Sequence, residues 1–295
     1  VAGEITGAAF KEAQTIKENL VTVLPDIDFQ MSLRKISYTN GRVDYACGFT
    51  PTGAVTLSEV LLTPKKIMNA QEICKEDLRQ IWSSASMGFS AHNDNMPKDV
   101  EAALLNEILM DTAQATDLDL WQGVAATTGR IGGFIELFDA DAGVIKANNG
   151  ITTLAGAITK ANVQTEIEKV LEAVPVSLRR KKNTVFLVSS NVALAYEQAL
   201  ISAGISNGMG GAEMNLAYGS TKITVVDALP DNTFVVYEVK NLYFGTGLLA
   251  DHNEIRIKDM DESDLSGNVR YKMVYTGGVQ YINPTEIVWY LSTTV

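Results

Sequence analysis

The sequence predicts an α+β protein built as two lobes that adjoin one long helix. Residues 97–123 supply the helix, because apolar side chains recur there at three- and four-residue intervals. Strand-like alternation precedes this helix and returns near the end of the chain, whereas residues 126–245 mix helical and strand patterns. A long helix that is apolar over much of its girth needs partners on more than one side, so we expect both lobes to pack against it.

Both ends of the long helix carry the expected signals. Asn95 can cap the first turn, and Pro97 stands where a missing N–H costs nothing. Asp99 and Glu101 place negative charge near the positive end of the helix dipole, and Gly123 supplies a stop. The rise of an α-helix makes this element about 39 Å long.

The N-terminal segment predicts a short amphipathic helix from Gly7 to about Leu20, which Pro25 ends. A lone helix of this size is marginal in water. It therefore needs a surface to lie on, either on its own chain or on a neighbour's.

A strand and a long excursion follow. Residues 27–34 alternate as a half-buried strand does, and Asn40-Gly41 is the pair that a tight hairpin turn needs. The chain from Lys35 to Ser58 is rich in glycine and threonine and returns through residues 55–62. Because isolated hairpins are not stable, this two-stranded excursion is either pinned by another subunit or mobile. The side chains expected on the buried face of the first strand are Ile27, Phe29, Met31 and Leu33.

Helices and strands then alternate. A second helix is predicted over residues 69–84, before the long one. In the middle lobe the patterns predict, in order, a helix that Asn162 caps and Pro175 ends, a buried strand over 184–188, a helix over 191–203, the glycine-dense loop 204–211 and two strands within 222–239.

Strand patterns also dominate the C-terminal segment. Ile255 and Ile257, and then residues 269–275, alternate with charged residues, and the apolar run EIVWYL follows. Ladder strands need partners, and we expect these to be the strands at 27–34 and 55–62. The first and last parts of the chain would then form one lobe, with the middle lobe inserted.

Composition excludes several classes of protein. A hydrophobic fraction of 46% and a charged fraction of 20% fit neither a disordered chain nor a disulfide scaffold, and a net charge of −11 argues against direct wrapping of nucleic acid. Cys47 and Cys74 favour two buried free thiols over one disulfide. No apolar run approaches the roughly 18 residues of a membrane span, and no signal peptide is recognisable. The chain begins at Val1, which fits either removal of a preceding segment or a numbering that omits leading residues.

The sequence supplies little that could carry catalysis, so we predict no catalytic, cofactor-binding or metal-binding residues. His92 and His252 both stand in polar loops, and no nucleophile elbow, zinc-protease or phosphate-loop motif occurs. Asp139-x-Asp141 faintly resembles the start of a calcium loop, but Gly150 stands where the bidentate Glu is needed. The acidic turn 259–264 and the basic run 179–182 are more simply solvated loops than a cation site and a nucleic-acid site.

The order of these segments resembles that of the major capsid proteins of tailed bacteriophages, which have the Hong Kong 97 fold. Residues 55–82 are similar to the strand-to-helix entry of the peripheral domain of these proteins. Residues 99–123 look like their long spine helix, residues 168–200 resemble their axial domain, and 243–290 resemble the strands that return to the peripheral domain.

The resemblance implies a shell subunit with the following organisation. Residues 1–24 would be an N-terminal arm, and residues 25–125 would form the first part of the peripheral domain, with an extended hairpin loop at about 35–60. Residues 126–245 would be the axial α/β domain, inserted before the peripheral strands of residues 246–295.

The resemblance also implies the partners. Copies would form pentamers and hexamers in an icosahedral virion that encloses double-stranded DNA without sequence-specific contact. The shell would assemble in the bacterial cytoplasm, without a membrane, and a portal and decoration or scaffolding proteins would join it. No lysine lies between Lys35 and Lys65, so we expect no cross-link of the kind that one family member forms through a loop lysine. The residues expected at contacts between copies are Phe10, Tyr38, Asn40, Gly41, Thr52, Gly53, Gly208, Gly210 and Gly211.

Three alternatives remain open at this point. An encapsulin, a bacterial compartment shell of the same fold, would hold cargo protein in place of DNA. A soluble α/β enzyme would have a pocket with converging carboxylates. A tail-tube or decoration protein is disfavoured by the long helix.

Overall fold

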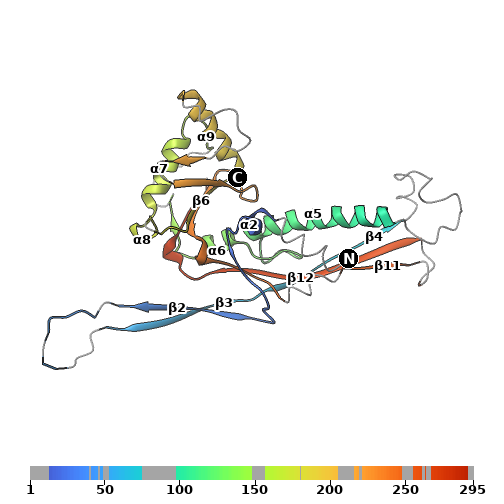
Figure 1. The fold of residues 1–295 in the computed structure, drawn as a ribbon, viewed down its shortest axis with the longest axis horizontal. Helices are drawn as coiled ribbons and strands as arrows, with labels where there is room; N and C mark the ends of the chain where they lie inside the picture. The colour runs from blue at the N-terminus through green and yellow to red at the C-terminus, as the bar shows by residue number, and fades with distance from the viewer. Residues whose placement is uncertain are drawn as a thin grey trace.

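The computed structural model describes residues 13–39, 41–45, 47–48, 53–74, 98–147, 157–179, 181–204, 216–218, 221–247, 255–260, 263 and 267–291. These residues form an elongated molecule with two sheets, one long helix and a projecting hairpin (Figure 1).

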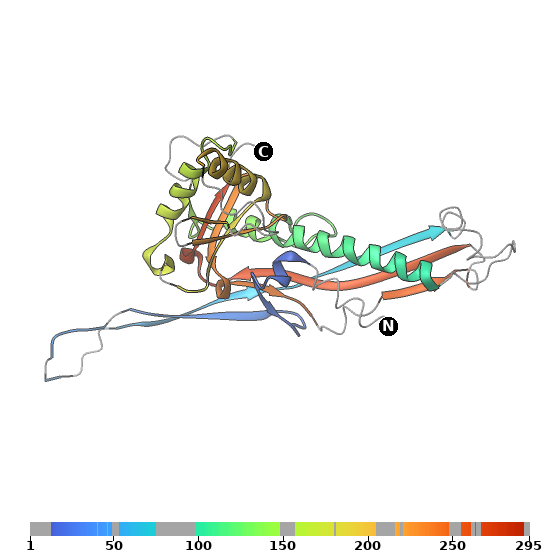
Figure 2. The same ribbon diagram turned by 45° about the horizontal axis from the view of Figure 1, so that its top comes forward.

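The long helix α5 (Lys98–Gln122) lies along a five-stranded sheet, as both views of the ribbon show (Figures 1 and 2). Alternate residues of β12, Tyr271, Met273 and Tyr275 among them, are buried, because one face of the sheet packs toward α5. The strands of this sheet are β1 (Thr22–Leu24), β10 (Leu242–Gly245), β12 (Asn268–Tyr281), β11 (Ile255–Asp259) and β4 (Lys65–Cys74).

A second, six-stranded sheet forms the upper lobe in Figure 1. Helices α7 (Val163–Ala173) and α9 (Ser190–Ser202) pack against it, and the short helix α8 (Val176–Arg179) follows α7. In spatial order its strands are β5 (Ile145–Lys146), β13 (Ile287–Leu291), β9 (Thr233–Glu238), β6 (Thr184–Val188), β8 (Thr221–Val225) and β7 (Ala217–Tyr218).

The remaining two strands form a hairpin of their own. Strands β2 (Met31–Tyr38) and β3 (Val55–Leu62) pair with each other from Met31↔Leu62 to Tyr38↔Val55. In both views they project from the body of the molecule, in the direction opposite to the far end of α5 (Figures 1 and 2).

Two large hydrophobic clusters form the core, and the first of them joins the two lobes. The first joins the end of α5 to α6 (Phe134–Ala140) and to both sheets, with Trp121 and Phe134 at a ring-centroid distance of 5.4 Å. The second lies beneath α7 and α9, where Phe186 stacks on Phe234 at 6.0 Å. The end of the long helix is thus the point at which the two lobes meet.

Several predicted elements are confirmed. The long helix runs from Lys98 to Gln122, and the N–H of Gly123 donates to the carbonyl oxygen of Asp119 at 3.0 Å. A Cβ at Gly123 would overlap the carbonyl oxygens of Ile131 and Asp119, so glycine is required there by close approach. Strand 184–188 is found with the predicted limits, and the two helices of the middle lobe differ from prediction by a residue or two at their ends.

The helix predicted over 69–84 is wrong for residues 69–74, which belong to β4. Strand β4 pairs with β12 from Lys65↔Gly277 to Cys74↔Asn268, and this long ladder outweighs the local helical pattern. The rest of the predicted helix lies outside the described residues.

The strand predicted over 27–34 begins later, at Met31. Ile27 and Leu33 are buried as expected, but Phe29 is 78% exposed and Met31 is 39% exposed. The tight turn expected at Asn40-Gly41 is also wrong. Tyr38 pairs with Val55, and the N–H of Thr39 donates to the carbonyl oxygen of Ala54, so no two-residue turn at Asn40-Gly41 joins the two strands.

The expected strand partners were wrong as well. Strand β12 pairs with β4, β10 and β11, while β13 pairs with β9 and β5 in the six-stranded sheet. The first hairpin pairs only with itself among the described strands. The two sheets therefore share the C-terminal segment, since β12 belongs to one and β13 to the other.

Both cysteines are free, as expected, but Cys47 is exposed and Cys74 is half-buried. The prediction of two buried thiols was therefore wrong. Of the N-terminal helix, the structure describes only its last part, α2 (Gln14–Lys17); residues 1–12 lie outside the described chain.

Candidate interaction surfaces

The hairpin presents one apolar face to solvent. Ile36 lies opposite Leu57 and Tyr38 lies opposite Val55, so these four side chains share one face of the two-stranded ribbon. Their exposed fractions are 71%, 71%, 67% and 65% in that order. The other face over the same stretch carries Lys35, Ser37, Thr56 and Ser58. A strip of aliphatic and aromatic side chains backed by polar ones is typical of a docking surface.

Three of the predicted contact residues meet at the outer end of this face. The N–H of Gly41 donates to the hydroxyl oxygen of Tyr38 at 3.3 Å. A Cβ at Gly53 would stand 3.1 Å from the carbonyl oxygen of Thr39 and 3.2 Å from the Tyr38 ring, so the tyrosine lies close over this glycine. The remaining predicted contact residues lie outside the described chain: Phe10, Asn40, Thr52, Gly208, Gly210 and Gly211.

Ile36, Val55 and Leu57 are not among the contact residues predicted from the sequence. Their alternation with polar residues was available as a signal of a strand with one apolar face. The predicted turn at Asn40 and the predicted start at Ile27 set no register for the two strands, so this alternation alone does not place Ile36 opposite Leu57.

The N-terminal segment is anchored on its own chain from residue 13 onward. Gln14 Nε2 donates to the carbonyl oxygen of Val225 at 2.8 Å, and the N–H of Asp227 donates to Gln14 Oε1 at 3.2 Å. Farther along, the hydroxyl of Tyr237 donates to the carbonyl oxygen of Leu20 at 2.9 Å. The segment thereby joins the long helix to the six-stranded sheet.

Asp117 lies at the centre of this junction. The N–H of Thr15 donates to its Oδ1 at 3.1 Å. Burial raises the pKa of the Asp117 carboxyl, more than hydrogen bonds from Thr15 and Gln14 lower it, and the nearby charge of Asp227 adds to the increase.

Asp141 of the acidic motif and Lys181 of the basic run make structural contacts. Asp141 accepts from the Tyr281 hydroxyl at 2.7 Å and from the N–H of Gly143 at 2.7 Å, and these hydrogen bonds lower the pKa of its carboxyl. Lys181, two residues after the end of α8, pairs with Glu238 of β9 at 2.6 Å and with Glu286, just before β13, at 2.7 Å.

The structure gathers no candidate metal site from these motifs in the chain it describes. No group of three or more His, Cys, Asp or Glu side chains among those residues could hold a metal ion, and His92 and His252 lie outside them. No helix in the described part is long and apolar enough to cross a bilayer.

Comparison with known proteins identifies the fold through structure alone. No protein-family profile matches the sequence, and no curated protein matches it. The capsid chain of a native GTA particle is similar over 94% of this chain and 89% of its own, with a TM-score of 0.64 and 13% identity. A chain of the satellite phage P4 procapsid is similar over 100% of this chain and 100% of its own, with a TM-score of 0.62 and 11% identity. A capsid chain of cyanophage A-1(L) is similar over 96% of this chain and 94% of its own, with a TM-score of 0.63 and 13% identity. The chain therefore has the mixed α/β fold of Hong Kong 97-type capsid proteins, as the order of its segments predicted.

Proposed function

We propose that this protein is a major capsid protein, the repeated subunit of an icosahedral shell around a double-stranded DNA phage genome. Its fold, shared over nearly the full length with capsid chains of a GTA particle and two phages, supports the proposal. Fold alone does not set function, so the proposal needs an observation on this chain.

That observation is the hairpin. A two-stranded ribbon is marginally stable alone, yet this one projects from the body and exposes Ile36, Tyr38, Val55 and Leu57. Exposed apolar side chains on a projecting hairpin do not stabilise a monomer. In a shell, the same hairpin can be buried against a neighbouring subunit. We therefore assign the apolar face to a contact with an adjacent copy, in which Tyr38, Gly41 and Gly53 take part.

The remaining contacts are proposed from the resemblance. Residues 1–24 serve as the arm, although the part from residue 13 onward is anchored on its own chain. Phe10, Asn40 and Thr52 contact adjacent copies. Gly208, Gly210 and Gly211 lie near the symmetry axes, where one sequence must fit rings of both five and six copies.

The division of the chain follows the same proposal. The five-stranded sheet with α5 corresponds to the peripheral domain, and the six-stranded sheet with α7 and α9 corresponds to the axial domain. The boundaries at 125 and 245 are proposed limits. Strand β13 lies beyond residue 245, yet it pairs with β9 in the sheet assigned to the axial domain. Portal, scaffolding and decoration proteins are proposed partners in a virion assembled in the bacterial cytoplasm.

Sedimentation and negative-stain electron microscopy of the purified chain test the function. We expect the purified chain to form closed particles. Particles isolated from the native source should also contain double-stranded DNA. Particles that hold a cargo protein and no DNA would identify an encapsulin-type compartment. A homogeneous monomer or dimer, under conditions that preserve assemblies, would contradict the shell and favour a soluble enzyme.

A further inference from the structure

The hairpin meets the body of the molecule through a short apolar root. Leu33 of β2 and Leu62 of β3 are buried in a small cluster, against which Tyr243 and Ile282 of the body pack. Farther out than Leu33 and the residue opposite it, every residue of the two strands except Lys35 is exposed. Lys35 is therefore the outermost side chain of β2 and β3 that is partly covered.

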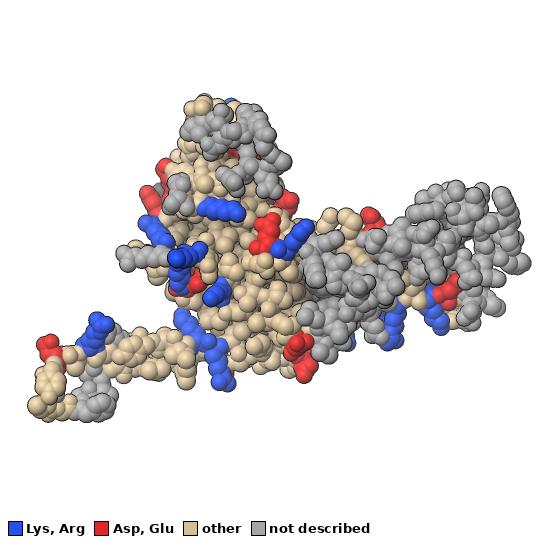
Figure 3. Space-filling model, viewed as in Figure 1, with Lys and Arg blue, Asp and Glu red and all other residues tan. Residues whose placement is uncertain are grey.

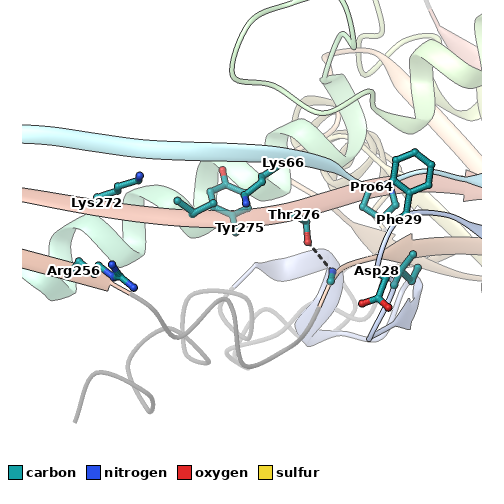
Figure 4. Close-up of a pocket in the computed structure, with 11 residues that line it drawn as sticks. Asp28, Phe29, Pro64, Lys66, Arg256, Lys272, Tyr275 and Thr276 are labelled. Carbon is teal, nitrogen blue, oxygen red and sulfur yellow. Dashed lines mark hydrogen bonds between the residues drawn. The ribbon is translucent and has the colours of Figure 1, made fainter.

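The root leaves one side of the hairpin without support. Phe29 and Pro64, which stand just before β2 and just after β3, line one end of a hollow of about 690 Å³ on the five-stranded sheet (Figure 4). Phe29 is 78% exposed, so it packs little against the body. Because a two-stranded ribbon is only marginally stable by itself, a further contact is needed to hold it in one direction.

Lys35 supplies such a contact. Its ammonium group donates to Oδ1 of Asn283 at 2.7 Å, and the hydroxyl of Thr285 donates to the same oxygen at 3.1 Å. A hydrogen bond from a cation is stronger than one between neutral groups. Lys35 and Asn283 are both half-buried, so water and salt screen this bond less than they would at an exposed position.

A carboxylate beside Asn283 adds to the attraction. Glu286 pairs with Lys181 at 2.7 Å. Burial raises the pKa of Glu286, but hydrogen bonds from Lys181 and Asn283, and the charges of Lys181 and Lys35, bring it below the ordinary value of 4.5. Glu286 is therefore ionised at neutral pH and attracts Lys35 as well as Lys181. Figure 3 shows Lys and Arg side chains around the place where the hairpin leaves the body.

Asn283 is a rigid anchor because it lies on a crossover between the two sheets. It stands between β12 of the five-stranded sheet and β13 of the six-stranded sheet, and the buried Asn241 stands on the second crossover, between β9 and β10. The N–H of Asn283 donates to Oδ1 of Asn241 at 2.7 Å, and Nδ2 of Asn241 donates to the carbonyl oxygen of Asn283 at 2.7 Å. Lys35 thus binds where the two crossovers are joined.

This anchor also decides which face of the hairpin is presented to solvent. Successive side chains of a strand point to opposite sides. With Lys35 held on the body, Ile36 points away from it, together with Leu57, which lies opposite Ile36. Both side chains are 71% exposed. The apolar face of the hairpin therefore begins at the residue next to the anchor.

We propose that Lys35 is a positioning residue, whose bond to Asn283 fixes the direction of the hairpin and turns its apolar face away from the body. The use of this direction in a contact with a neighbour rests on the proposed function. The direction itself is a property of the single subunit, so the two proposals can fail independently.

Double electron–electron resonance on the free subunit tests this role. One spin label is attached to the native Cys47, which is exposed between the two strands of the hairpin, and the other to Lys222→Cys, at an exposed position of β8. Cys74→Ser removes the second native thiol in every sample. Lys35→Met keeps the aliphatic stem and removes the donor, whereas Lys35→Arg keeps a donor. Arg34→Met is the matched control, because it removes an exposed cation on the opposite face of β2.

Lys35→Met is expected to widen the distribution of distances between the two labels about twofold. The Tm of the free chain should stay within about 2 °C of that of the unmodified chain, since the bond is partly exposed. Lys35→Arg and Arg34→Met should both keep the narrow distribution.

Equal widths for Lys35→Met and the unmodified chain would overturn the proposal, as would the same widening in Arg34→Met or in Lys35→Arg. A widening that comes with a fall in Tm of more than about 5 °C would also overturn it, because Lys35 would then support the fold in general and not the direction of the hairpin. The distances are measured without assembly, so they do not depend on whether the chain forms a shell.

Discussion

The indole N–H of Trp121 donates a 2.9 Å hydrogen bond to Oγ1 of Thr15, and both side chains are fully buried. This bond links the last turn of the long helix to the N-terminal segment. It lies where the two lobes meet, because the Trp121 ring also contacts Phe134 and Tyr237 at centroid distances of 5.4 and 6.3 Å.

Thr15→Val keeps the shape of the side chain and removes the hydroxyl that accepts from the indole and also hydrogen-bonds the Asp117 carboxyl. The buried N–H is then left without a partner, which costs about 1–3 kcal/mol of the free energy of unfolding. A fall in Tm of several degrees in a thermal scan of the free chain is expected. Thr56→Val, the same exchange at an exposed strand position, should leave Tm unchanged. Equal Tm values for Thr15→Val and the unmodified chain would contradict the role of this bond.

Asp117→Asn tests the electrostatics of the same junction. Burial raises the folded-state pKa of this carboxyl above its ordinary value of 3.8, so the folded state holds the proton more tightly than the unfolded state. That contribution to stability is present at low pH and is lost as pH rises through the folded-state pKa. Asn mimics the protonated form and can still accept from Thr15. The difference in Tm between Asp117→Asn and the unmodified chain should therefore shift in favour of the variant as pH rises from 4 toward neutrality. A Tm difference that does not change with pH would refute this account.

Ile36→Asn and Leu57→Asn test the apolar face of the hairpin. Both side chains are 71% exposed, so their replacement should leave the Tm of the free subunit within about a degree. Assembly should fall at least about tenfold in sedimentation profiles, because each variant puts an amide into a contact that excludes water. Ser37→Asn and Thr56→Asn, on the opposite face, are the matched controls. Normal particle yield from Ile36→Asn and Leu57→Asn would remove this face from the contact.

Hydrogen exchange should distinguish the hairpin from the anchored N-terminal segment. Amides of β2 and β3 are expected to exchange rapidly in the free subunit and at least about tenfold more slowly in particles. Amides of Thr22–Leu24, which pair in parallel with Tyr243–Gly245, should be protected in both states. Hairpin protection that is the same in both states would show that no neighbour covers it.

Local signals sufficed where an element is defined by its own periodicity and its own ends. The long helix carries Pro97 before its first residue and Gly123 after its last, and β6 is a short apolar run that is buried on both faces. The order of such elements was enough to predict the fold that the structural comparisons support.

The errors arose where a partner distant in sequence decides the outcome. Residues 69–74 are a strand only because β12 lies beside them, and the register of the hairpin is set by Met31↔Leu62, which no local pattern encodes. Tyr38 and Gly53 were predicted as contact residues from the sequence, whereas the shared face of Ile36 and Leu57 follows only from this register. Arg256 and Lys272 likewise become neighbours only through the β11–β12 ladder.

A cryo-electron microscopy reconstruction of the assembled chain tests the central claim most directly. We predict closed particles with rings of five and six copies, in which the face formed by Ile36, Tyr38, Val55 and Leu57 is buried on an adjacent copy. Particles in which that face remains in solvent would contradict the assigned contact. A chain that forms only monomers or dimers under the same conditions would contradict the shell itself.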